Sequence, residues 1–147
     1  MYRLLVILHL LGASIWIGAH LIVSTLVLPR ALRARDPAVI LDFEARFERL
    51  GRPALLVQVV TGLWLAYIRV PGIGRWFSPD SPVSALIAAK LALLVIMLAI
   101  AAHARLRVIP RVRPDTLHVL AWHIVAVTIV SVAFLIVGVG IRTGGLF

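Results

Sequence analysis

The chain has 147 residues, of which 62% are hydrophobic and only 14% charged, whereas a soluble domain carries about 25% charged residues. This composition excludes a water-soluble fold and predicts an integral membrane protein. The absence of cysteine excludes disulfides, iron–sulfur clusters and thiolate zinc sites. A net charge of +9 would favour nucleic-acid binding in a soluble protein. Here the arginines cluster at the ends of apolar segments without a basic stripe or aromatic platform, so we expect no nucleic-acid partner.

Four apolar segments approach the length of about 20 residues that a membrane-spanning helix needs. We predict spans at about residues 4–28, 53–70, 83–106 and 117–141. The first is too long for a signal peptide and has no cleavage site, so we expect it to be a span. Pro29 is predicted to end the first helix, and Pro71 with Gly72 the second. Residues 1–147 are therefore predicted to form one all-α domain, an integral membrane four-helix bundle.

The segment between the first two spans has a helical pattern of its own. Asp36 followed by Pro37 is a typical helix start, and Gly51 is predicted to close the segment. Apolar residues recur between them at helical spacing, with charged residues on the other face. One interpretation is an amphipathic helix at the membrane surface. The alternative is a cytoplasmic extension of the second span.

Loop charge predicts the orientation. The first loop holds six arginines and the third holds four, whereas the opposite side of the membrane has only Arg3, Arg69, Arg75 and Arg142. Because positive loops stay in the cytoplasm, we expect both termini to be periplasmic in a bacterial inner (cytoplasmic) membrane. Trp76 and Phe77 then fall at the outer interface, where an aromatic belt is expected.

Five basic side chains lie inside the spans, where an ionisable group costs at least about 2.5–3.5 kcal/mol on insertion scales. No carboxylate lies in the four predicted spans to pair with them. Counted along the helices, His9 and Lys90 share a depth near the outer side, whereas His20 and His123 lie deeper toward the cytoplasm. These candidate ligands of a haem or a metal are His9, His20, Lys90, His103 and His123.

The first helix carries two of these histidines. His9 and His20 are eleven residues apart, close to three full turns, so they share a face of the helix. One helix can present two imidazoles in this way to two stacked sites in a bundle core. Each side chain also has a simpler interpretation, because a membrane histidine often bonds a backbone carbonyl or a hydroxyl. Lys90 can extend its amine toward the surface, and His118 lies at the interface.

The choice of cofactor follows from the ligand set. Haem b needs one or two axial nitrogens and an apolar slot, whereas copper accepts imidazoles directly. We predict an inner centre at His20 with His123, joined by His103 in one interpretation, and an outer centre at His9 with Lys90. For copper, the predicted ligands are His20, His103 and His123. A third interpretation is a non-catalytic membrane subunit whose histidines serve packing.

Several motifs resemble a known family. The runs "LHLLGASIWIGAHLIVSTLVLPR" from Leu8, "HARLRVIPR" from His103, "AWHIVAVT" from Ala121 and "RTGG" from Arg142 resemble small bacterial membrane proteins of the CopD (copper resistance protein D) type. The resemblance covers nearly the whole chain and implies copper handling.

The chain is also similar to HemJ-type protoporphyrinogen oxidases, which are four-helix membrane proteins that bind haem b. The shared features are an early histidine, "LPR", "GLWL" and "AKLAL". That resemblance implies a role in haem binding for His9 and Lys90, whereas His20 and His123 are additional here.

From these patterns we expect a membrane-embedded haem b protein acting in electron transfer or redox chemistry, with copper binding or transport as the alternative. The expected partners are the lipid bilayer and an electron donor or acceptor, for which a quinone is a candidate. Glycine-rich helix faces favour a homodimer.

Overall fold

The computed structural model describes residues 1–78 and 81–144, and these residues form helices and connecting turns without a strand. Four helical stretches of 27 to 33 residues are long and apolar enough to cross a membrane. They confirm the all-α, four-helix membrane fold predicted from composition. The long helices are α1 (Tyr2–Ile22), α3 (Ala38–Arg69), α4 (Pro82–His103) and α5 (Leu117–Thr143).

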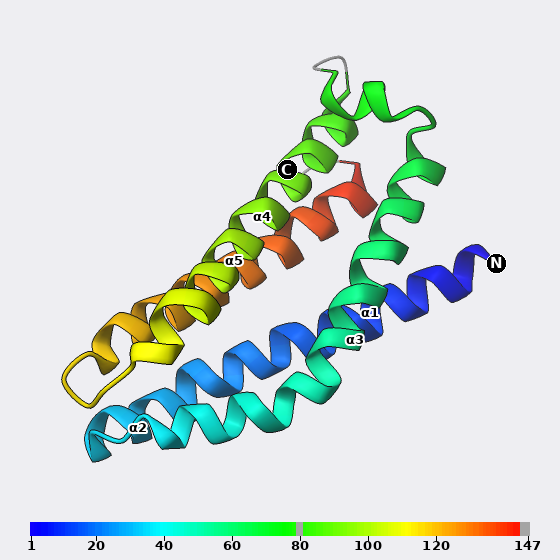
Figure 1. Cartoon of the computed structure of the whole chain (residues 1–147). Helices are drawn as coiled ribbons and strands as arrows, with labels where there is room; N and C mark the ends of the chain where they lie inside the picture. Colours follow the sequence, from blue (N-terminus) through cyan, green and yellow to red (C-terminus); the bar gives the residue numbers. More distant parts are fainter. Residues whose placement is uncertain (79–80, 145–147) are drawn as a thin grey trace.

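Short helical segments connect the long helices. The π-helical turn η1 (Val23–Val27) joins α1 to α2 (Leu28–Ala34), and the 3-10 turn η2 (Ile73–Phe77) joins α3 to α4. After α4 come the π-helical turn η3 (Ala104–Val108) and the 3-10 turn η4 (Ile109–Arg111). Figure 1 places α2 and the loop before α5 together at one end, and η2 at the other. We call the end that holds α2 and the loop before α5 the basic end, because it carries the arginines of the first and third loops.

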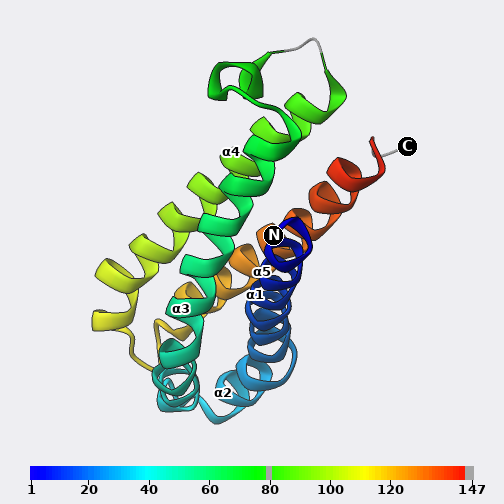
Figure 2. The same cartoon turned by 90° about the vertical axis from the view of Figure 1, so that its right-hand side faces the viewer.

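The helices pack as two pairs. Helix α1 packs mainly against α3 and α4 mainly against α5, while contacts between α1 and α5 join the pairs. Figure 2 shows α1 beside α5. Helices α3 and α4 have almost no direct contact, and Figure 1 shows them diverging. The bundle is therefore less closed along this edge than along the others.

The prediction that Pro29 ends the first helix is wrong. The chain stays helical to Ala34 because the five residues before Leu28 form a π-helical turn, in which the Leu28 N–H bonds the Val23 carbonyl. The wider turn accommodates a proline ring that would clash with the carbonyl four residues earlier in an α-helix. The Ser24 and Thr25 hydroxyls donate to the Leu21 carbonyl at 3.1 and 2.6 Å, and so satisfy an acceptor beside the distortion.

The segment before the second span is an extension of that span. Helix α3 begins at Ala38, whose N–H bonds the Asp36 carboxylate at 2.9 Å, as the start signal predicted. Gly51 does not close the segment: it lies inside α3, where the Phe47 ring occupies the space that a Cβ would need. Pro53 also lies within the helix, and α3 bends visibly in its middle in Figure 1. A proline bends a helix in this way because it removes one backbone hydrogen bond and crowds the preceding turn.

Trp76 lies in η2, in the connection between α3 and α4. Its side chain is buried, and its indole N–H donates to the Val70 carbonyl at 2.9 Å. Phe77 is exposed, as expected of an interfacial aromatic. Gly72 has φ +97°, a conformation that favours glycine, and it lets the chain leave α3 and turn into η2. The tryptophan therefore anchors the connection between α3 and α4.

A cluster of buried apolar side chains holds the basic end together. It joins α2, the start of α3 and the start of α5 through Leu28, Ala31, Ile40, Leu117 and Leu120. Ile40 is 1% exposed and is among the largest fully buried side chains of the described residues. The cluster fixes the connection between α2 and α3 against α5, so the helices that follow leave the basic end in defined directions.

We predict that Ile40→Ala lowers the free energy of unfolding by about 2–5 kcal/mol, because a large-to-small change leaves a cavity that the cluster fills only in part. Thermal unfolding in detergent micelles, followed by circular dichroism, measures the change. Val60→Ala is the matched control, since Val60 is half exposed on α3. An Ile40→Ala protein as stable as the Val60→Ala protein would contradict the role of this cluster.

Candidate functional site

The five basic side chains predicted as ligands occupy four places. His103 and His123 are together near the basic end, between α4 and α5. His20 lies on α1 beside Trp16. His9 contacts α3, and Lys90 of α4 lies beside Phe134 and Gly138 of α5. The structure pairs His123 with His103 and not with His20.

His103 and His123 are in direct contact. The His103 Nδ1 and His123 Nε2 atoms are 2.9 Å apart, and the rings stack with centroids 5.1 Å apart and an angle of 15° between their planes. Each histidine comes from a different helix, twenty residues apart in sequence. The contact lies where the last turn of α4 leads into the π-helical turn η3. Two imidazoles therefore meet at a place where the backbone departs from regular geometry.

Hydrogen bonds assign the protons of this pair. The His123 Nδ1 atom is 2.8 Å from the Val119 carbonyl, which can only accept, so Nδ1 carries the proton. The neutral ring then has an unprotonated Nε2, which accepts the hydrogen bond from the His103 Nδ1–H. His103 in turn keeps an unprotonated Nε2. A backbone carbonyl that fixes the ring in this way is the arrangement that supports ligating histidines in metal sites.

His20 has no such partners. Both of its ring nitrogens are buried without a hydrogen-bond partner among the described residues, and so is the Trp16 indole nitrogen. The two rings lie 5.0 Å apart, and Trp16 also contacts Phe47 of α3 with ring centroids 6.4 Å apart. A buried polar atom without a partner costs about 1–3 kcal/mol, so these nitrogens require an explanation. They mark His20 as a residue whose ring is free to bind a further group.

His9 is held by two side chains of α3. Its Nδ1 lies 3.0 Å from the Thr61 Oγ1, and its Nε2 lies 3.4 Å from the Gln58 Nε2. The Thr61 hydroxyl donates its proton to the Val57 carbonyl at 2.5 Å. Thr61 must therefore accept from His9, which places the proton on His9 Nδ1. The simpler interpretation, a histidine bonded to a hydroxyl across helices, describes this nitrogen of His9.

Lys90 lies between α4 and α5. Its Nζ is 6.0 Å from the centroid of the Phe134 ring and 3.2 Å from the point where a Cβ would stand on Gly138. The absence of a side chain at Gly138 therefore leaves space for the amine. No salt bridge to Lys90 occurs among the described residues. The lysine is thus partly buried beside an aromatic ring and a glycine, without a carboxylate.

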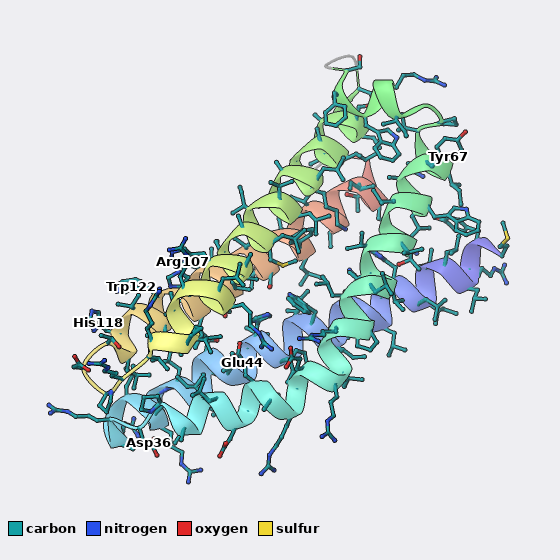
Figure 3. The ribbon with its side chains drawn as sticks, in the orientation of Figure 1. Asp36, Glu44, Tyr67, Arg107, His118 and Trp122 are labelled. Carbon is teal, nitrogen blue, oxygen red and sulfur yellow. The ribbon has the colours of Figure 1, made fainter. Side chains whose placement is uncertain are left out.

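Sequence reasoning missed two carboxylates near the basic end. Glu48 on α3 accepts a hydrogen bond of 2.6 Å from Arg105 of η3 and also pairs with Arg52 one turn later. Glu44 lies one turn before Glu48 and comes within electrostatic range of Arg105. In Figure 3, Glu44 lies toward the space between helices, whereas Arg107, His118 and Trp122 extend from the surface. The sequence signal that could have identified these carboxylates is the spacing of four residues between Glu44 and Glu48, which places them on one face of a helix.

A three-ligand metal site is not assembled. In residues 1–78 and 81–144, no group of three or more His, Cys, Asp or Glu side chains lies close enough to hold one metal ion. His20 therefore does not join His103 and His123 as a third ligand in this arrangement. His118 is exposed and bonds the Asp115 carbonyl at 3.1 Å, as expected for an interfacial residue. The strongest candidate for metal binding is the His103–His123 pair.

Comparison with models of protein families identifies the family of this chain. Residues 41–141, more than half of the chain, match the model of copper resistance protein D (CopD). The chain belongs to the CopD family. Neither a curated protein nor a solved structure matches it. The resemblance to the CopD family is therefore confirmed over residues 41–141, which include the imidazole pair and Lys90.

We predict that Gly62→Ala destabilises the protein by about 1–3 kcal/mol, the usual cost of overpacking. A Cβ on Gly62 would lie 3.0 Å from the His9 Cε1 atom, so the ring must move away from Thr61. Gly18→Ala is the matched control, because nothing lies within 4 Å of its Cβ position. We expect that variant to be neutral or up to about 1 kcal/mol more stable, owing to helix propensity. Equal unfolding temperatures for the two variants would contradict the close fit of His9.

Proposed function

We propose that this CopD-family protein binds copper as a cargo ion at His103 and His123, within the membrane near the basic end of the bundle. The observation that carries the proposal is the direct contact of two imidazoles whose tautomers are fixed by the Val119 carbonyl. Imidazole is a favourable ligand for copper, and the chain has no cysteine to compete for it. The family description, copper resistance, agrees with this cargo.

The pair has the chemistry of a reversible site. A single proton joins the two rings, between His103 Nδ1 and His123 Nε2. Copper that takes the place of this proton gains both nitrogens as ligands, while the His103 proton moves to the free Nε2 of the same neutral ring. Because a third side-chain ligand is absent from the described residues, the ion is held by few bonds. Such a site suits an ion that is passed on better than an ion that is kept as a structural element.

The position of the site follows from the proposed orientation. If both termini are periplasmic in a bacterial inner membrane, His103 lies toward the cytoplasm, two residues before Arg105. The ion pair between Arg105 and Glu48 then stands beside the site and links η3 to α3. We propose that copper binds on this side of the membrane and that the surrounding arginines stay in water or at the headgroups.

We predict that His103→Ala and His123→Ala each weaken copper binding at least tenfold, because either change removes one of two ligands. The protein in lipid nanodiscs is titrated with cuprous ion against a coloured chelator. Binding should also weaken as the pH is lowered, since protons compete for the ligand nitrogens. His118→Ala is the matched control, an exposed histidine outside the pair. Unchanged affinity in both pair variants would refute the site.

A second candidate function is supported by His20. The earlier expectation of a b-type haem requires an axial nitrogen in an apolar setting, and both His20 ring nitrogens are buried without a partner. His20 would hold the haem iron, and the group would supply one-electron redox chemistry. His9 fits this role less well, because Thr61 and Gln58 engage its two nitrogens. His123 is likewise engaged by Val119 and His103.

We expect that, if the protein is purified with haem, His20→Ala removes the Soret band while His118→Ala leaves it unchanged. The measurement is an absorption spectrum of the protein from cells supplied with haem, together with its iron and copper content. A spectrum without a Soret band in the wild type contradicts the haem function and leaves the copper function intact. A Soret band that survives His20→Ala assigns the haem to other ligands.

A further inference from the structure

The connection between α4 and α5 carries three basic side chains that neither proposed function uses. They are Arg107 of η3, Arg111 of η4 and Arg113 of the loop that follows. All three are exposed, and no ion pair to any of them occurs in residues 1–78 and 81–144. The ion pairs at the basic end involve Arg52 and Arg105 instead, which share Glu48. The three guanidinium groups are therefore available to an external anion.

The local structure places two of these arginines on a concave surface. The Arg113 N–H donates to the Thr116 Oγ1 at 2.9 Å, which closes the loop before α5. The Arg111 Nη1 donates to the Arg107 carbonyl at 3.5 Å, so its guanidinium group folds back toward η3. Beside it lies an open hollow of about 420 Å³, which is lined by Pro110, Arg111, Val112, Arg113, Asp115 and Thr116.

One carboxylate belongs to the same surface. Asp115 is exposed and lines the hollow, and its backbone carbonyl accepts a hydrogen bond of 3.1 Å from the His118 Nδ1. Asp115 reduces the positive charge of the segment but does not cancel it, because one carboxylate stands against three guanidinium groups. The hollow therefore favours an anionic ligand over a neutral or cationic one.

Large apolar side chains are exposed next to the arginines. Leu106, which precedes Arg107 in η3, and Trp122 on α5 are each 71% exposed. Trp122 lies one turn after His118, and Figure 3 shows Arg107, His118 and Trp122 extending from one side of the basic end. Tryptophan is enriched where a membrane protein meets the lipid head groups. A ligand that matches this surface must combine an anionic group with apolar chains.

We propose that this surface binds an anionic phospholipid of the surrounding bilayer. We call it the lipid face and define it by Leu106, Arg107, Arg111, Arg113 and Trp122. The guanidinium groups bind the phosphate oxygens, because the fork of N–H donors on arginine matches phosphate geometry. The acyl chains then lie along the exposed leucine and tryptophan.

Two other ligands fit the lipid face less well. A soluble phosphate would leave both apolar side chains unused. A zwitterionic phospholipid would place its own cation beside the guanidinium groups, and like charges repel. The proposal uses neither the copper site at His103 and His123 nor the side of the membrane on which the basic end lies.

The test is native mass spectrometry of the full chain in detergent micelles, which counts bound lipids and gives a Kd for the first one. The two probes are dioleoylphosphatidylglycerol and dioleoylphosphatidylcholine, which share their acyl chains. We expect the first to bind about tenfold or more tightly than the second, as several basic residues at a membrane surface together provide. Arg107→Gln should weaken phosphatidylglycerol binding about fivefold and leave phosphatidylcholine binding unchanged. Trp122→Ala should weaken both lipids alike, because the indole contacts the part that they share.

A matched pair of triple variants separates the lipid face from the general positive charge of the basic end. The variant Arg107→Gln/Arg111→Gln/Arg113→Gln should lose the preference for phosphatidylglycerol. The control Arg30→Gln/Arg33→Gln/Arg35→Gln removes three exposed arginines from the same end and should keep that preference within about twofold, because salt screens charges beyond about 10 Å. Circular dichroism checks that each variant is folded.

Three results would overturn the proposal. Equal losses in the two triple variants would assign the preference to a diffuse field of charge. Equal affinity of the wild type for the two lipids would remove the preference itself. Displacement of phosphatidylglycerol by an equal concentration of glycerol phosphate would show that the surface binds a free phosphate and does not use the acyl chains. A protein that binds no copper would leave each of these outcomes unchanged.

Discussion

A bilayer offers no water to a polar group, so each polar atom inside the spans must find its partner within the protein or in a ligand. This constraint explains most of the hydrogen bonds described above. Hydroxyls such as Thr61 bond carbonyls of their own helix, and the imidazoles bond a hydroxyl, a carbonyl or each other. The exceptions are informative for the same reason. Among the described residues, the buried atoms without a partner include the His20 nitrogens, the Gln58 Oε1 and the Ser131 Oγ.

The constraint also separates the molecule into two regions of different chemistry. Near the basic end, paired imidazoles and the Arg105–Glu48 ion pair lie beside the arginine-rich loops. Deeper in the bundle, His9 bonds Thr61 and Gln58 of α3, and Lys90 lies beside Phe134 and Gly138 of α5. The first region carries imidazole and charged side chains, whereas the second carries isolated polar groups among apolar residues. Both are built from helices that lie far apart in sequence and meet only in the folded bundle.

Much of this fold follows from local sequence signals. The four spans, the start of α3 after Asp36 and its end before Gly72 are determined by hydropathy and turn chemistry, which act over a few residues. The pairing of His123 with His103 could not be predicted from depth, because depth says nothing about which faces of α4 and α5 meet. The contact of Glu48 with Arg105 was missed because the two residues are 57 positions apart in sequence and meet only in the folded bundle.

The π-helical turn at Val23–Val27 has a consequence for how this chain can vary. A π turn holds one residue more than the α turn it replaces, so it rotates everything beyond it by about 100° relative to a regular helix. That rotation sets the direction in which Leu28 and Ala31 point, and both lie in the buried cluster with Ile40. Deletion of one residue in this turn would restore a regular helix but would turn α2 away from its partners. The segment is therefore expected to tolerate substitutions better than changes in length.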